Sequence, residues 1–150
     1  MTDATDDAAV PRIIAVEDNP ADVRLLREGV DAAEIELELT VYNSGRDAAD
    51  SMAAIAPDTP DEHPDLILLD LNVPGRSGFE LLELIRTDTA FQQVPVVIVS
   101  SSENPADIDR AYELAANAFA TKPADPDEYI RMIDATIEFW IATADPFTSQ

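Results

Sequence analysis

The sequence contains no cysteine, and this absence excludes disulfide bonds, thiolate metal ligands and thiol nucleophiles. Long hydrophobic runs are also missing, because no stretch approaches the roughly 20 apolar residues of a membrane-spanning helix. The first residues are acidic, whereas a signal peptide begins with basic residues. We therefore expect a cytoplasmic protein with no membrane partner.

Basic residues are scarce as well. Nine of them stand against 31 acidic residues, which gives a formal net charge of −22. Such a surface repels a phosphate backbone, so we expect no nucleic-acid partner. The composition is typical of salt-loving organisms, since concentrated salt shortens the Debye length to about 3 Å at 1 M. Eight of the basic residues are arginine, and Lys122 is the only lysine.

The apolar residues, 46% of the chain, suffice for one core and fall in short runs between turn residues. Strands are expected at Pro11 to Glu17, Ile35 to Tyr42, Asp65 to Leu71, Val94 to Val99 and Ala118 to Thr121. Five helices should alternate with them: after Asn19-Pro20, at Ser44 to Ile55, at Phe79 to Arg86, after Asn104-Pro105 and after Asp125-Pro126. Apolar strands joined through helices predict a doubly wound, five-stranded parallel α/β sheet. We expect one domain at residues 11–143, an acidic disordered tail at 1–10 and a short tail at 144–150.

Polar side chains stand where the predicted strands end. Glu17 and Asp18 end the first strand, Asp70 the third and Ser100 the fourth, while the fifth leads into Lys122. Ligands of open α/β sheets bind at this edge. Three carboxylates brought together need a cation, and Mg²⁺ prefers such oxygen ligands. An ionised Asp70 could then attack phosphorus and form an aspartyl phosphate, whose oxygens Lys122 and Ser100 would bind.

Each of these residues also has an ordinary explanation. Glu17 and Asp18 could cap the following helix, and Ser100 could be a turn residue. Lys122 alone would normally be a surface charge. The combination outweighs the separate explanations, because a lone lysine kept at a strand end suggests a task that the fork of arginine cannot perform.

Four segments resemble the receiver domain of two-component response regulators, the CheY-like family. They are IAVEDNPADVRLLRE, LILLDLNVPGRSGFELL, PVVIVSSS and FATKP, in this order between Pro11 and Trp140. The resemblance implies a flavodoxin-like sheet with strand order 2-1-3-4-5. It also implies a signalling switch that takes a phosphoryl group from a histidine kinase with Mg²⁺. Such a protein phosphorylates and dephosphorylates itself and is not a turnover enzyme.

The resemblance assigns roles to individual residues. It makes Asp70 the phosphoacceptor. The implied metal ligands are Glu17, Asp18, Asp70 and the backbone carbonyl of Asn72. The implied phosphate-binding and switch residues are Ser100, Lys122 and Phe119, and Asn72 and Ser102 flank the site, at positions where the family tunes phosphate lifetime. Phosphorylation should pull Ser100 inward and let Phe119 turn in behind it. The Lys122–Pro123 bond is typically cis in this family.

The expected partners are proteins. The resemblance is closest to single-domain regulators, which separate histidine kinases serve, including the phytochrome-linked kind. With no output domain expected, the signal would pass by contact to an unidentified downstream protein. The reporting surface should comprise the fourth helix, the fifth strand and the fifth helix. In the last of these, Tyr129, Met132 and Phe139 are either part of a wide buried face or a homodimer surface.

Two other functions remain open. A magnesium-dependent phosphohydrolase would also use Asp70 as its nucleophile, although that class needs a second acid two residues later, where Asn72 stands. A degenerate receiver could serve as a constitutive interaction module. A nucleotide-binding switch is disfavoured, because the sequence has neither a Gly-x-x-x-x-Gly-Lys loop nor a Gly-x-Gly-x-x-Gly turn.

Overall fold

The computed structural model describes residues 10–55, 59, 62–73, 75, 77–88 and 90–142. The strands are β1 (Arg12–Val16), β2 (Glu38–Tyr42), β3 (Leu66–Leu69), β4 (Val96–Ser100) and β5 (Ala118–Thr121). The α-helices are α2 (Pro20–Ala32), α3 (Gly45–Ala53), α4 (Gly78–Thr87), α5 (Pro105–Glu113) and α6 (Pro126–Ile137), and a π-helix, η2 (Glu138–Ala142), continues α6. The two predicted tails lie outside the described residues, apart from Val10.

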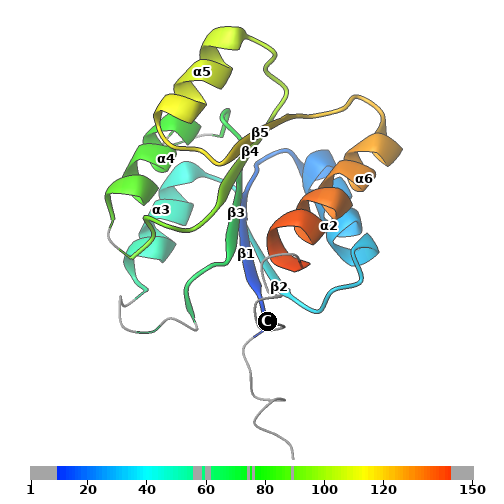
Figure 1. The fold of residues 1–150 in the computed structure, drawn as a ribbon, viewed down its shortest axis with the longest axis horizontal. Helices are drawn as coiled ribbons and strands as arrows, with labels where there is room; N and C mark the ends of the chain where they lie inside the picture. Colours follow the sequence, from blue (N-terminus) through cyan, green and yellow to red (C-terminus); the bar gives the residue numbers. More distant parts are fainter. Residues whose placement is uncertain are drawn as a thin grey trace, which may run out of the picture.

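The strands form one parallel sheet in the order β2-β1-β3-β4-β5. Helices α2 and α6 cover one face, and α3, α4 and α5 cover the other (Figure 1). The predicted fold, with its five strands and five helices, is therefore confirmed. Among the described residues, no helix combines the length and the apolar character that crossing a membrane requires.

Two clusters of buried side chains form the core, one on each face of the sheet. Successive residues of a strand point to opposite faces, so Ile67 and Leu69 of β3 join one cluster and Leu66 and Leu68 join the other. This arrangement explains why the central strands are continuous apolar runs. The edge strand β2, whose residues are all at least partly exposed, alternates instead.

The second apolar set of the last helix is mostly buried. Tyr129 is only 2% exposed, and Met132 packs against the core cluster beneath α2 and α6. Phe139 in η2 is 62% exposed, and its ring makes an edge contact with that of Trp140. The buried-face interpretation therefore holds for Tyr129 and Met132, and only Phe139 presents a large apolar surface.

Candidate functional site

The carboxyl ends of β1 and β3 bring two acidic side chains together. Val16 pairs with Leu69 in the sheet, so Glu17 and Asp70 leave neighbouring strands side by side. The backbone N–H of Asp70 donates to the carbonyl of Val16 at 3.1 Å and continues the ladder. Glu17 is 4% exposed and Asp70 is 6% exposed. Carboxylates buried to this extent need a positive partner, because desolvation penalises their charge.

Lys122 supplies a positive charge from the end of β5. Its Nζ donates to Glu17 Oε1 at 2.7 Å, to Asp22 Oδ2 at 2.8 Å and to Asp70 Oδ2 at 2.9 Å. These contacts use all three N–H groups of the ammonium. Burial alone would lower the pKa of Lys122, but the hydrogen bonds to the carboxylates outweigh burial and raise this pKa above its ordinary value. The lysine is therefore held charged beside Asp70.

One ammonium does not neutralise the site. Burial raises the pKa of Glu17 above its ordinary value of 4.5, and the nearby charge of Asp70 raises it further. Hydrogen bonds from Lys122 and from the backbone of Asn19 oppose this shift without cancelling it. The site thus retains an excess of negative charge that a second cation would relieve.

The acidic side chains are placed to bind such a cation. Oxygens of Glu17, Asp18 and Asp70 lie within 4.8 Å of one another. Asp18 is exposed while the other two are buried, so the group opens to solvent on one side. An all-oxygen donor set with excess negative charge fits a hard divalent cation. The three predicted carboxylate ligands are therefore brought together, and a divalent metal suits them.

Asn72 contacts this group through its backbone N–H. Its backbone N–H donates to Asp70 Oδ1 at 3.0 Å. The other oxygen of that carboxylate accepts from Lys122, so both oxygens of Asp70 have a donor. The role of the Asn72 carbonyl as a metal ligand stays a prediction.

Ser100 and Ser102 occupy the end of β4 and the loop that follows it. Ser100 is fully buried, and its Oγ accepts the N–H of Ser102 at 3.1 Å. The hydroxyl of Ser102 donates to Asp107 Oδ2 in the first turn of α5 at 2.7 Å. Ser102 therefore connects the loop to α5, and its expected influence on phosphate lifetime stays a prediction.

Phe119 and the peptide bond after Lys122 complete the predicted set. Phe119 is half-buried and packs against the core cluster beneath α3, α4 and α5, while its backbone N–H donates to the Tyr112 hydroxyl at 3.1 Å. The expectation of a cis Lys122–Pro123 bond is wrong, since no described peptide bond is cis. The trans form is favoured by about 0.5–1 kcal/mol, and in this form Lys122 already reaches its three carboxylates.

Sequence reasoning missed Asp22, the third carboxylate on Lys122. The side chain of Asn19 caps α2 by accepting the N–H of Ala21 at 2.9 Å and that of Asp22 at 3.3 Å. This cap fixes the first turn of the helix, which carries Asp22 toward the site. An acid in a first turn is common because it interacts favourably with the helix dipole, so its contact with Lys122 left no separate signal.

Comparisons with known proteins agree on one family. The model of the response regulator receiver domain matches residues 13–134. Response regulator Rcp1 of Synechocystis sp. is 32% identical over 140 residues, which are 93% of this chain and 95% of that protein. The phosphorylated cyanobacterial phytochrome response regulator RcpA has a similar structure, with a TM-score of 0.83, 35% identity and coverage of 90% of this chain and 96% of that one. The Mn²⁺-bound form of Rcp1 gives a TM-score of 0.81 at 32% identity, covering 89% and 96% of the respective chains.

Proposed function

Because the chain belongs to the response regulator receiver domain family and is therefore a switch of two-component signalling, we propose that Asp70 is its phosphoacceptor. One observation carries this assignment. Asp70 is buried, its carboxylate lies close to those of Glu17 and Asp18, and the Lys122 ammonium is 2.9 Å from it. A nucleophile for phosphoryl transfer needs this combination of an ionised oxygen, a nearby cation and a place for a metal.

The transfer itself is a displacement at phosphorus. A carboxylate oxygen of Asp70 forms the new P–O bond, while the P–N bond of a phosphohistidine on the kinase breaks and the imidazole keeps the electron pair. Lys122 then pairs with an oxygen of the phosphoryl group as a compact positive charge. The Ser100 hydroxyl, at the end of the neighbouring strand, is the proposed hydrogen-bond donor to another oxygen.

The proposed metal is Mg²⁺. Its ligands would be the carboxylates of Glu17, Asp18 and Asp70 and the carbonyl of Asn72, and when bound it would neutralise charge on the transferring group. Oxygen-only sites accept Mg²⁺ and Mn²⁺ alike, which is compatible with the Mn²⁺-bound form of Rcp1. Mg²⁺ suits a site completed by water and phosphoryl oxygens.

The signal would leave through the side of the molecule formed by α5, β5 and α6. Ser100 and Phe119 lie on β4 and β5, so a movement of Ser100 toward the phosphoryl group would make room for the Phe119 ring. The exposed Phe139 in η2 adjoins this side and favours contact with a downstream protein or a second copy of the chain. We propose a histidine kinase as the donor, of the phytochrome-linked kind, since the similar protein RcpA is a phytochrome response regulator.

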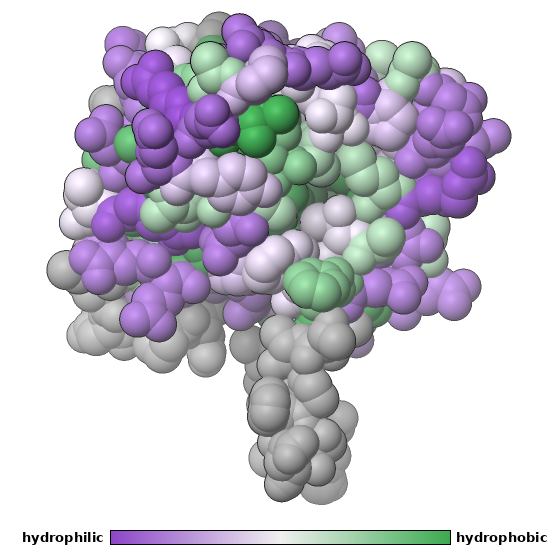
Figure 2. Space-filling view, turned by 45° about the horizontal axis from the view of Figure 1, so that its top comes forward, coloured by the Kyte–Doolittle hydropathy of each residue, from purple (hydrophilic) through white to green (hydrophobic). Residues whose placement is uncertain are grey.

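The net negative charge of the protein supports a proposal about where it functions. Hydrophilic residues cover large areas of the face shown in Figure 2, with hydrophobic groups between them. With a net charge of −22, this surface suits a cytoplasm of high salt concentration and disfavours nucleic acid. We therefore propose a cytoplasmic receiver from a salt-loving organism.

Incubation with Mg²⁺ and acetyl phosphate, followed by intact mass measurement, tests the proposal. We expect one added phosphoryl group, which is lost with a chelator or in Asp70→Asn. Asp65→Asn is the matched control, because Asp65 is an exposed acid just before the opposite end of the same strand, β3. Steady hydrolysis of phosphate esters would instead indicate a phosphohydrolase, and the absence of any adduct would indicate an interaction module.

A further inference from the structure

Asp22 is the one partner of Lys122 that the proposed chemistry does not use. Glu17 and Asp70 both belong to the group of carboxylates close enough to share a metal, and Asp22 does not. Yet Asp22 Oδ2 lies 2.8 Å from Lys122 Nζ, as close as the other two carboxylates. Its side chain is 24% exposed, so solvent screens the contact only in part.

The other two partners of Lys122 change their tasks during phosphorylation. On the proposed mechanism, Asp70 would form a bond to phosphorus, and Glu17 would serve as a ligand of the metal. A dication beside these carboxylates also repels the ammonium. A lysine held only by Glu17 and Asp70 would then be free to swing into solvent, away from the incoming phosphoryl group. Asp22 is the carboxylate that remains available to it.

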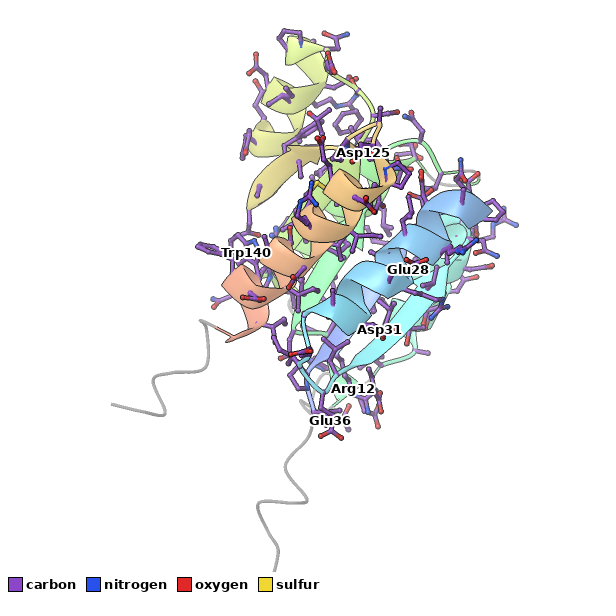
Figure 3. All side chains as sticks on the ribbon, turned by 90° about the vertical axis from the view of Figure 1, so that its right-hand side faces the viewer. Arg12, Glu28, Asp31, Glu36, Asp125 and Trp140 are labelled. Atoms are coloured by element: carbon purple, nitrogen blue, oxygen red, sulfur yellow. The ribbon has the colours of Figure 1, made fainter. Side chains whose placement is uncertain are left out.

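Asp22 lies in helix α2, which is held in place by its N-cap and by packing. The Asn19 side chain fixes the start of α2. The same helix packs closely against α6, as Figure 3 also shows, and a Cβ at Gly29 would lie 2.5 Å from Ile133 Cβ. The carboxylate of Asp22 therefore has a defined position relative to the sheet, on a helix and not at a strand end.

We propose that Asp22 is a positioning residue that anchors the Lys122 ammonium beside Asp70 while the metal and the phosphoryl group occupy the other carboxylates. This inference rests on the proposed function. It opposes the simpler view that Asp22 is one more negative charge, which would repel a phosphodonor. The two views predict rate changes of opposite sign when Asp22 is neutralised.

The first test compares Asp22→Asn with Asp31→Asn at saturating Mg²⁺ and limiting acetyl phosphate. Asp31 is an exposed acid near the other end of α2 (Figure 3), so this control removes an equal charge from the same helix. Asn keeps an oxygen that can accept from Lys122 but removes its charge, so we expect Asp22→Asn to slow phosphorylation about tenfold, as for loss of charge assistance from one hydrogen bond. Asp31→Asn should leave the rate unchanged. Unchanged or faster phosphorylation in Asp22→Asn overturns the inference.

A double-mutant cycle shows whether Asp22 acts through Lys122. In a Lys122→Gln background, Asp22→Asn should have no further effect on the phosphorylation rate. An equal slowing in both backgrounds would mean that Asp22 acts by another route, and it would overturn the inference.

The single lysine offers a readout that needs no phosphorylation. Lys122 is the only lysine, and its side chain is 11% exposed. Its rate of acetylation by acetic anhydride, measured by peptide mapping, therefore reports whether the side chain has moved into solvent. With Mg²⁺ present, Asp22→Asn should label several-fold faster than wild type and Asp31→Asn should not. Equal labelling overturns the inference, whereas a wild-type protein that accepts no phosphoryl group overturns the proposed function itself.

Discussion

Replacing Lys122 by methionine should destabilise the protein strongly in the absence of metal. The ammonium lies 2.7–2.9 Å from three carboxylates, and the side chains of Glu17 and Asp70 are only 6% and 7% exposed. Removing one member of a buried ion pair typically costs about 3–5 kcal/mol, because the remaining charge is left buried without a partner. We expect Lys122→Met to lower the free energy of unfolding by about 3 kcal/mol at pH 7 in a chelator, measured by urea denaturation.

Acid and metal should both reduce this difference. The folded protein holds the pKa of Glu17 above 4.5, so folded Glu17 binds its proton at a higher pH than unfolded Glu17 does. The contribution of Glu17 to the free energy of unfolding therefore rises as the pH falls through the range between its folded and unfolded pKa values. Loss of the Lys122 hydrogen bond raises the pKa of Glu17 further, so the stability of Lys122→Met should approach that of wild type on acidification. Saturating Mg²⁺ should narrow the difference at pH 7 by supplying positive charge.

Arg24→Met provides the matched control for a lost cation. Arg24 pairs with Glu28 at 3.2 Å on the surface of α2, where the two side chains are 81% and 47% exposed. A pair this exposed typically contributes under about 1 kcal/mol. The reasoning is refuted if Lys122→Met is no less stable than Arg24→Met, or if its difference from wild type widens as the pH falls.

Three further predictions concern the framework of the molecule. Gly29→Ala should lower the free energy of unfolding in urea by about 1–3 kcal/mol, since its Cβ would meet Ile133 at 2.5 Å; unchanged stability would contradict the close packing of α2 on α6. Arg86→Lys should cost about 1–3 kcal/mol in the same assay, because one ammonium cannot reach both the Val94 carbonyl and Asn117 Oδ1, each 2.7 Å from the guanidinium. The melting temperature of the wild type should rise from low to multimolar KCl, because the charge of −22 repels itself; equal temperatures would contradict salt adaptation.

The fold was predictable because hydrophobic pattern and connectivity agree along the chain. Strand boundaries were less predictable, as β2 shows, since it begins at Glu38 and not at Ile35. Ile35 and Leu37 do pack against the core, which explains their apolar character. They precede the paired region because β1 begins at Arg12, the partner of Glu38, so no earlier strand residue is present to pair with them. Apolar pattern reports burial, and pairing depends also on the neighbouring strand.

The site was predictable where it depends on strand ends and unpredictable where it depends on side-chain direction. The sheet edge brings Glu17, Asp70 and Lys122 together, since all three follow the carboxyl ends of parallel strands. Asp22 reaches the same ammonium from a helix, and an acid at that position is ordinary in any helix. For Ser102, the sequence position indicates a residue beside the site. Its hydroxyl nevertheless donates to Asp107 in α5.

The most direct test of the central claim is chemical mapping of the phosphoryl group. An acyl phosphate on aspartate is reduced by borohydride to homoserine, whereas a phosphate ester on serine or threonine is not. After treatment with Mg²⁺ and acetyl phosphate, we expect borohydride to convert residue 70, and no other acidic residue, into homoserine. An unmodified Asp70, or a stable phosphate ester at Ser100, would contradict the assignment of Asp70 as the phosphoacceptor.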